Sequence, residues 1–258
     1  MKIVRYQSGN QVQYGALEEE TVRGFQGSPF ALGWEPDKAV FDGSRVKLSE
    51  VKLLTPCQPS KYLGVGLNFK DAAAAIGRPC PTYPITFIKP TGAVIGPEEP
   101  IQLKNVEQPD YLYEGELALV VGKTAKNVRQ ENAMEYILGC TCSNDITDRT
   151  QFGKDDLRLK GADTFGPIGP CIDTQVDPNH AVIRSFLNGE KRQEGNTEEM
   201  IFSPSYMVAF FSSYMTLYPG DVISLGTPAG LGNIKPGDQI IVEVEGIGRL
   251  YNPVIGIG

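Results

Sequence analysis

The sequence predicts a mainly β fold with a few helices, of the α+β class, from three observations. Short apolar runs rich in β-branched residues recur along the chain and are separated by glycine and proline. Helical periodicity is confined to a few segments. The chain of 258 residues is 41% hydrophobic and 21% charged, an ordinary balance for a globular protein. Disorder and collagen-like repeats are therefore excluded.

Residues 1–53 form the first predicted unit, a small N-terminal β-rich domain. Strand-like runs cover residues 2–6 and 11–17, and polar turns separate them. The proline-bearing stretch LTPCQPSK, residues 54–61, is typical of a joint between two units. The sequence therefore predicts a second, larger domain over residues 56–258.

Within the larger domain the strand-like runs are YLGVGLN, ITFIKP, GELALVVGK, DVISLGTP, QIIVEVEGIG and RLYNPVIGIG. Two segments favour helices instead. Residues 129–139, RQENAMEYILG, carry apolar side chains and end at a glycine. Residues 203–217 begin with Ser and Pro and carry an apolar stripe, so this helix is expected to pack across the sheet.

The charge and cysteine content limit the partners and the compartment. A net charge of −7 and a pI near 4.9, without a cluster of Lys or Arg, argue against nucleic acid or an anionic membrane as partner and favour a small molecule. No apolar run approaches the roughly 20 residues of a membrane span, and the first residues pattern as strand, turn and strand, so a cytoplasmic protein is expected. The 5 cysteines lack C-x-x-C spacing and are expected to be buried free thiols.

Three carboxylates are the candidate metal ligands. Glu114 and Glu116 occupy positions i and i+2 of the strand YEGELALVV, so their side chains project from one face. Both could instead face solvent on an edge strand, at little cost. Asp145 in CTCSNDITDR could complete a hard oxygen site for Mg²⁺, Mn²⁺ or Ca²⁺, although alone it also fits a turn or a helix cap. The site depends on whether the fold brings the three together.

Longer motifs carry a resemblance to a known family. They are YLGVGLNFKD, FIKPTGAVIG, YEGELALVVGK, NDITDR, KGADTFGPIGP, LNGEKRQEGNTEEMIF, LYPGDVISLGTPAGLG and KPGDQIIVEVEGIGRLYNPV. In this order, over roughly residues 56–258, the chain resembles the fumarylacetoacetate hydrolase (FAH) family. The resemblance implies a FAH-type mixed β-sandwich/β-roll catalytic domain with a small N-terminal domain, usually in a homodimer. It also implies that Glu114, Glu116 and Asp145 ligate Mg²⁺, Mn²⁺ or Ca²⁺.

The resemblance also implies substrate-binding positions. Arg149 matches an arginine suited to clamping a carboxylate, and Lys160 matches a lysine able to stabilise an enolate or move a proton. Thr227 matches a threonine that holds the substrate's carboxylate. The spacing alone favours a surface ion pair for Arg149, a solvated side chain for Lys160 and a turn position for Thr227, and the motif context reverses that preference. Family members often have a glutamine seven residues after the metal aspartate, where this chain has Phe152, and Gln151 stands one place earlier as the candidate substrate contact.

The segment GLNFKDAAAAIG departs most from the family pattern. Hydrolytic members carry a histidine and, three residues later, a glutamate on a short lid helix, and here those places are Ala72 and Ala75. The alanine run is still expected to form the lid helix after an Asp71 cap. His180, the one histidine of the chain, matches no catalytic position and is expected in a turn.

Three functional hypotheses follow. The first is a metal-dependent enzyme acting on a 2-oxo acid or β-diketo acid through a metal-stabilised enolate, by decarboxylation or isomerisation, with Lys160 and Arg149 as catalytic groups. The second is an acylpyruvate or fumarylacetoacetate-type C–C bond hydrolase with another base, Asp71 or Lys70. The third is a non-catalytic metal-binding descendant of the family. Intact Glu114 and Lys160 speak against the third.

Overall fold

The computed structural model describes residues 1–104 and 109–258, and it confirms the mainly β class. A 12-stranded sheet forms the centre of the fold, with β4, β3, β2, β1, β14, β12, β11, β17, β6 and β7 in that order across it and with β5 and β8 paired at its side. Its strands are β1 (Lys2–Ser8), β2 (Gln11–Glu18), β3 (Thr21–Phe25), β4 (Phe41–Lys47), β5 (Lys52–Leu53), β6 (Tyr62–Gly66), β7 (Ile85–Lys89), β8 (Val94–Ile95), β11 (Gly115–Val121), β12 (Ile137–Asn144), β14 (Gly166–Asp173) and β17 (Val222–Ser224).

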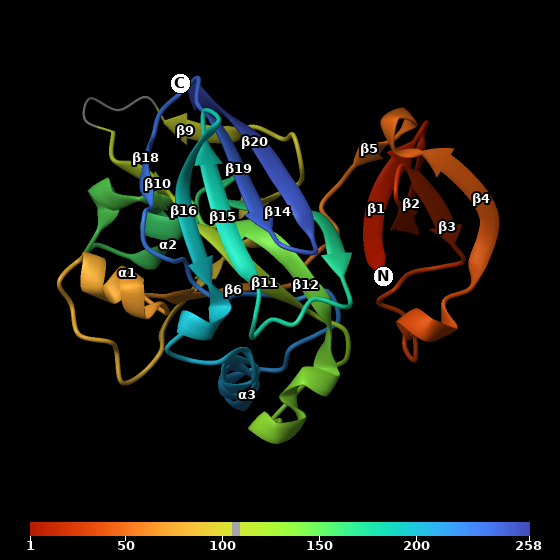
Figure 1. Ribbon diagram of the computed structural model, residues 1–258, viewed down its shortest axis with the longest axis horizontal. Helices are drawn as coiled ribbons and strands as arrows, with labels where there is room; N and C mark the ends of the chain where they lie inside the picture. The colour runs from red at the N-terminus through yellow and green to blue at the C-terminus, as the bar shows by residue number, and fades with distance from the viewer. Residues whose placement is uncertain (105–108) are drawn as a thin grey trace.

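The N-terminal strands β1 to β5 form a small unit beside the larger one (Figure 1). Two short 3₁₀ helices belong to it, Pro36–Lys38 and Leu48–Glu50. The two units share one sheet, because β1 pairs with β14 through Lys2 opposite Asp173 and Ile3 opposite Ile172. The small unit is therefore attached to the larger one by backbone hydrogen bonds as well as by the connecting chain.

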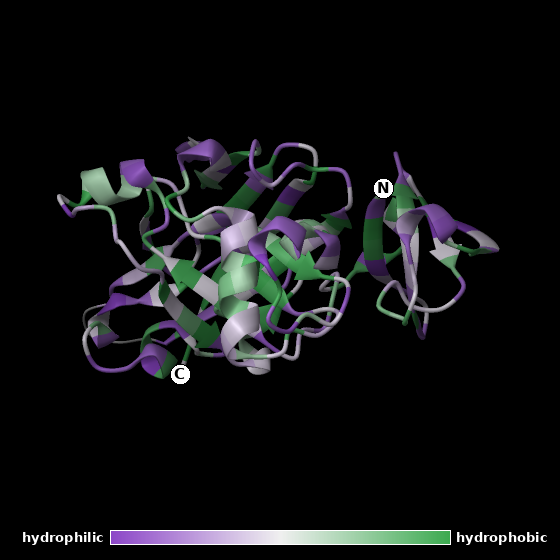
Figure 2. Cartoon of the chain, turned by 90° about the horizontal axis from the view of Figure 1, so that it is seen from below, coloured by the Kyte–Doolittle hydropathy of each residue, from purple (hydrophilic) through white to green (hydrophobic). Residues whose placement is uncertain are grey.

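A second sheet covers one face of the larger unit. It has five strands, in the order β16 (Glu190–Asn196), β15 (Val182–Leu187), β19 (Gln239–Val244), β20 (Gly248–Ile257) and β9 (Ile101–Lys104). Leu117 and Leu119 of β11 lie in one apolar cluster with Ile183 of β15 and Val242 of β19. The two sheets therefore pack face to face as a β-sandwich. Figure 2 shows the apolar segments gathered in the strands of this interior.

A small third sheet borders the carboxylates. It has three strands, in the order β13 (Thr147–Asp148), β10 (Tyr111–Tyr113) and β18 (Gly232–Ile234). The α-helices are α1 (Lys70–Ala75), α2 (Asp156–Lys160) and α3 (Pro204–Tyr214), and further 3₁₀ helices are Thr91–Ala93, Gln130–Tyr136, Arg149–Gln151 and Thr197–Glu199. Among the residues that the structure describes, no helix is both long and apolar enough to cross a membrane.

The predicted helix over residues 203–217 is confirmed as α3, which begins after the N-cap Ser203 and ends at Tyr214. The helix predicted over residues 129–139 is wrong in type and length. A 3₁₀ helix covers Gln130–Tyr136, and Ile137 already belongs to β12, where it pairs with Val121. The sheet takes these residues because their backbone groups complete the ladder with β11.

The lid segment also differs in detail from the expectation. The alanines do form the short helix α1, but Phe69 is its N-cap, and Asp71 lies inside the first turn. Asp71 therefore does not cap this helix. His180 lies in a turn, as predicted, where its N–H donates to the carbonyl of Asp177.

Candidate metal centre

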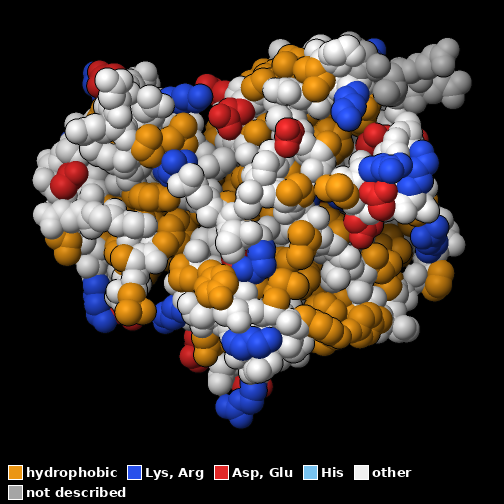
Figure 3. Space-filling view, turned by 180° about the vertical axis from the view of Figure 1, so that it is seen from behind, with side chains coloured by type: hydrophobic (Ala, Val, Ile, Leu, Met, Phe, Trp, Pro, Cys, Tyr) orange, Lys and Arg blue, Asp and Glu red, His pale blue; other side chains and the backbone are white. Residues whose placement is uncertain are grey.

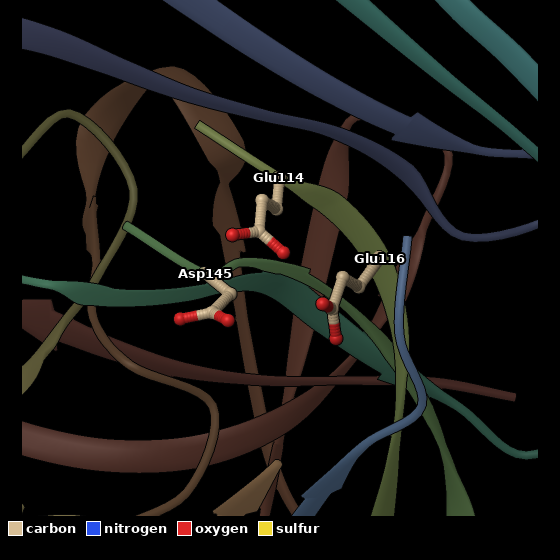
Figure 4. Close-up of side chains that lie close together, drawn as sticks. All are labelled: Glu114, Glu116 and Asp145. Atoms are coloured by element: carbon tan, nitrogen blue, oxygen red, sulfur yellow. The ribbon is translucent and has the colours of Figure 1, made fainter. Parts of the chain in front are cut away.

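Glu114, Glu116 and Asp145 converge at one end of the β11–β12 pair (Figure 4). One carboxylate oxygen from each lies within 4.8 Å of the others. Glu114 precedes β11 rather than lying within it, and Asp145 directly follows β12. Because these strands are antiparallel, the start of β11 meets the end of β12, and Asp145 N donates to Glu114 O at 2.9 Å. The expected triplet is thus brought together. Only Glu116 lies within β11, whereas both glutamates were expected on one strand.

Glu116 is the most confined of the three carboxylates, with 1% of the residue exposed. Its Oε2 accepts a hydrogen bond from Gly226 N at 2.9 Å and another from the Ser224 hydroxyl. Burial, followed by the negative charges of Asp145 and Glu114, raises the pKa of Glu116 well above its ordinary value. The alternative in which both glutamates face solvent is therefore wrong.

Lys160 at the end of α2 places its ammonium among the carboxylates. Its Nζ donates to Glu114 Oε1 at 2.9 Å and also contacts Asp145 Oδ2. Burial alone would lower the pKa of Lys160, but the charges of Asp145 and Glu114 outweigh it and raise the pKa above its ordinary value. Lys160 is 8% exposed, so the solvated-chain alternative is wrong.

A second lysine, Lys89 of β7, is buried against the same centre, with 1% of it exposed. Its Nζ donates to Lys160 O at 2.6 Å and to Ile146 O at 3.1 Å, and lies 2.7 Å from Asp145 Oδ1. The contact with Asp145 is an ion pair without hydrogen-bond geometry, so this buried oxygen has no hydrogen-bond partner among the described residues. Burial is the main cause that lowers the pKa of Lys89. Lys89 was not singled out from the sequence, where the one signal for it was a lysine within the apolar run ITFIKP.

Thr227 lies beside the peptide that separates the two glutamates. Its Oγ1 donates to Gly115 O at 2.9 Å and accepts from Gln193 Nε2 at 2.7 Å. The hydroxyl proton of Thr227 is therefore already used within the protein. Gln193, which is 1% exposed, was not singled out from the sequence, although it lies in the motif LNGEKRQEGNTEEMIF.

The structure places Arg149 and Gln151 farther out, on a 3₁₀ helix that follows β13. The Arg149 side chain is 51% exposed and its Nε donates to Asp110 Oδ2 at 3.0 Å. Gln151 lines a cavity of about 590 Å³, together with Tyr111 and Phe165. The three metal-site carboxylates do not line this cavity, so it lies beside the centre rather than over it.

Asp71 joins the lid helix α1 to the loop that carries Thr227. Its Oδ1 accepts from Ala72 N at 2.7 Å, and its Oδ2 accepts from Ala229 N at 3.1 Å. On the same helix Ala72 is 7% exposed, whereas Ala75 faces solvent. Both carboxylate oxygens of Asp71 are therefore engaged by backbone donors, and α1 lies packed against the core.

A comparison with protein families shows which kind of protein carries this centre. Residues 61–255 match the model of the fumarylacetoacetate (FAA) hydrolase C-terminal domain. The chain belongs to the fumarylacetoacetate hydrolase family. Residues 1–56 match a second model, described as Rv2993c-like, N-terminal.

Solved structures similar to this FAH-family chain have the same fold. One is 5-carboxymethyl-2-hydroxymuconate delta-isomerase from Mycobacterium smegmatis, with a TM-score of 0.90, 38% identity and 100% of both chains covered. Another is maleylpyruvate hydrolase from Sphingobium sp. SYK-6, in complex with manganese(II) and pyruvate, with a TM-score of 0.82, 26% identity and 100% of both chains covered. The expected FAH-type architecture is confirmed.

One relative of the chain is the 4-hydroxyphenylacetate degradation bifunctional isomerase/decarboxylase of Escherichia coli. It is 38% identical over 234 residues, which are 87% of this chain and 54% of that protein. The chain thus spans about half the length of this relative. The similar proteins named here are isomerases, decarboxylases and hydrolases of small organic acids.

The residues at the centre fit a hard divalent cation. All three candidate ligands are carboxylates, the donor type that Mg²⁺ and Mn²⁺ prefer. Burial and then the negative charges of Asp145 and Glu114 raise the pKa of Glu116, and a bound cation would offset this concentration of negative charge. Glu114, Glu116 and Asp145 would hold the ion, and Lys160 and Lys89 lie around them.

Proposed function

We propose that this protein is a divalent-metal-dependent FAH-family enzyme that acts on a 2-oxo acid or β-diketo acid by decarboxylation or isomerisation. The single observation that carries the proposal is the convergence of Glu114, Glu116 and Asp145 around the Lys160 ammonium. Three carboxylates suit Mg²⁺ or Mn²⁺, and a lysine among them can hold a proton close to the reacting atoms. The relatives that are isomerases and decarboxylases support this reaction class.

When bound, the cation supplies positive charge that stabilises the enolate formed from the substrate. Lys160 holds a proton within the centre, and we propose that it delivers this proton to the enolate carbon. In decarboxylation the C–C bond to the β-carboxylate breaks and CO₂ leaves. The electron pair of that bond stays on the substrate as the enolate, which takes up the proton. In isomerisation Lys160 gives its proton to one carbon, and the resulting neutral amine takes back the proton that another carbon loses.

Arg149 and Thr227 are proposed as the substrate-binding groups, with Gln151 as a third contact. Arg149 could clamp a carboxylate once its guanidinium leaves Asp110, because its side chain is half exposed. Thr227 would act mainly through its position, because its proton is donated to Gly115 O. Gln151 lines the cavity beside the centre, where the far end of a substrate could lie.

The lid helix favours this reaction over hydrolysis. Hydrolytic cleavage of a C–C bond needs a base that deprotonates water, a contribution of roughly 10² to 10⁴ in rate. Ala72 and Ala75 supply no proton-transfer group, and the Asp71 carboxylate is engaged by two backbone N–H groups. A C–C bond hydrolase with Asp71 or Lys70 as base is the second candidate, and the maleylpyruvate hydrolase of similar fold favours it.

Product analysis separates the candidates. Purified protein with Mg²⁺ or Mn²⁺ is incubated with oxaloacetate, a 2-oxo acid with a β-carboxylate, and with acetylpyruvate, a β-diketo acid. We expect release of CO₂ or a faster approach to the keto–enol equilibrium, lost after EDTA treatment and in Glu116→Ala. Two acid fragments from acetylpyruvate would favour the hydrolase, and activity retained both with EDTA and in Glu116→Ala would refute the metal mechanism.

We further propose a cytoplasmic homodimer. All five cysteines are free thiols, as a reducing compartment favours, and four are buried as expected, whereas the expectation of burial is wrong for the exposed Cys80. Burial raises the pKa of Cys140 to about 12. Hydrophobic side chains gather on the rear face of the molecule (Figure 3). Exposed apolar residues occur on the outermost strand β7 and near α3, namely Ile85, Ile88, Tyr83 and Tyr214. Light scattering should give twice the chain mass, and a monomer would contradict this proposal.

A further inference from the structure

The motif LNGEKRQEGNTEEMIF, residues 187–202, contains the turn and the second strand of the hairpin β15–β16, which supplies no carboxylate to the metal centre. One of its side chains nevertheless reaches the strand that does. Gln193 of β16 is 1% exposed, and both ends of its amide are hydrogen-bonded. A buried amide with all its hydrogen bonds made is fixed in a single orientation.

The amide oxygen of Gln193 faces the strand of the glutamates. Its Oε1 accepts from Gly115 N at 3.1 Å and from Ser185 Oγ at 2.8 Å. Its Nε2 donates to Thr227 Oγ1 at 2.7 Å and to Pro228 O at 2.8 Å. The four bonds use both acceptor positions and both protons of the amide.

Thr227 closes these contacts into a ring. Its hydroxyl accepts from Gln193 and donates to Gly115 O, while Gly115 N donates back to Gln193. Gly115 stands between Glu114 and Glu116, so both of its backbone polar groups are held by this ring. The spacing of the two glutamate backbones therefore depends on side chains from the hairpin and from the Thr227 loop.

Backbone packing keeps the hairpin and the loop in fixed contact. A Cβ at Gly195 of β16 would lie 2.4 Å from Pro228 Cβ, and a Cβ at Gly230 would lie 2.4 Å from Arg192 O. Gly230 also has a φ of +97°, which favours glycine. Such close approach at two positions holds the loop rigidly against the hairpin that carries Gln193.

We propose that Gln193 is a positioning residue for the metal centre: it fixes Gly115, directly and through Thr227, and thereby sets the geometry of Glu114 and Glu116 for the cation. This inference rests on the proposed metal-dependent function. Outer residues that orient metal ligands typically change metal affinity by about 10- to 100-fold when they are replaced. Gln193 acts here through the backbone between two ligands.

The test measures Mn²⁺ affinity without substrate, by isothermal titration calorimetry on the full chain. Gln193→Met keeps the side-chain volume and removes all four hydrogen bonds, so we expect Mn²⁺ affinity to fall at least about 10-fold. Ser185→Ala is the matched control, because it removes one buried bond to the same amide and leaves Gly115 and Thr227 held. We expect it to lower the thermal stability of the metal-free protein and leave Mn²⁺ affinity nearly unchanged.

A second pair of variants decides the matter if Gln193→Met does not fold. Thr227→Val keeps the shape of the side chain and opens the ring, whereas Thr227→Ser keeps the hydroxyl. We expect weaker Mn²⁺ binding for Thr227→Val and recovery for Thr227→Ser. Wild-type affinity in folded Gln193→Met, or in Thr227→Val, would overturn the inference while the metal centre stands. No Mn²⁺ binding by the wild-type protein would overturn both.

Discussion

Lys89 Nζ lies 2.7 Å from Asp145 Oδ1, and the two side chains are 0% and 1% exposed. The ammonium is thus buried together with a carboxylate that we assign to the metal centre. It also donates to the backbone carbonyl of Lys160, so it links the metal aspartate to the end of the helix that carries the proposed proton donor.

Lys89→Met should destabilise the metal-free protein by about 3 kcal/mol, because it breaks a buried ion pair and leaves the carboxylate cluster with the Lys160 ammonium but without that of Lys89. Lys70→Met is the control, since the Lys70 side chain is 57% exposed and lies 3.7 Å from Glu199. Its effect should stay below about 0.5 kcal/mol. Urea unfolding in EDTA measures both. Equal, small effects would show that the Lys89 contact does not stabilise the fold.

Glu116→Gln should stabilise the metal-free protein above acidic pH. Burial and the neighbouring carboxylates raise the pKa of Glu116 above its ordinary 4.5 in the folded state. The contribution of Glu116 to the free energy of unfolding is complete below its ordinary pKa of 4.5 and is lost as the pH rises through its raised pKa in the folded state. The glutamine variant escapes this loss, so its advantage should grow with pH, by about 1.4 kcal/mol for each unit of the pKa shift.

Urea unfolding of both proteins in EDTA, from acidic to neutral pH, measures this advantage. Adding Mn²⁺ should reverse the order, because only the wild-type protein keeps all three carboxylates. Stability curves that coincide at every pH would mean that Glu116 does not carry the buried charge we describe.

Asp71→Asn should keep kcat within roughly 10-fold of wild type, whereas loss of a general base costs about 10² to 10⁴. The amide oxygen can still accept from Ala229 N, as Asp71 Oδ2 does at 3.1 Å. Asp71→Ala removes this acceptor and should raise KM, because the loop carrying Thr227 loses its tie to the lid. Steady-state kinetics with oxaloacetate decide this, and a collapse of kcat in Asp71→Asn would make Asp71 the base.

Ala72→His combined with Ala75→Glu should add acetylpyruvate hydrolysis, up to about 10²-fold over wild type. Ala72 is 7% exposed, so the larger imidazole must displace part of the packed lid, and we expect lower thermal stability as well. Ala74→His with Ala75→Glu places the imidazole on the exposed side of α1 and serves as control. No gain over this control would show that the missing dyad does not decide the reaction.

Local patterns predicted eight strands, namely β1, β2, β6, β7, β11, β17, β19 and β20, and marked the three carboxylates as candidates, whereas the resemblance to the FAH family implied that they act together. Glu114 and Glu116 lie beside an apolar β-branched run, whereas β12, the strand that precedes Asp145, was not predicted, and its pairing with β11 is the long-range step that completes the triplet. The 3₁₀ helix before Ile137 was not predictable, since pairing with Val121 overrides the local helical pattern.

The surroundings of the centre were less accessible to sequence reasoning. Lys89 contacts Asp145, which lies 56 positions later in the chain, and Gln193 contacts Gly115, which lies 78 positions earlier. No spacing rule in the sequence reports such contacts. Asp71 resembled a helix cap, yet its second oxygen bonds to Ala229 in a distant loop. These roles depend on tertiary packing, which single-residue preferences do not encode.

The central claim is that the three carboxylates bind a cation that stabilises an enolate. Its most direct test is a calorimetric titration of the wild-type protein with Mn²⁺, alone and with oxalate, a mimic of a 2-oxo acid enolate. We predict one Mn²⁺ per chain, affinity raised at least about 10-fold by oxalate through their coupling at one site, and no binding in Glu116→Ala. Absence of Mn²⁺ binding, or an affinity that oxalate does not change, would contradict the claim.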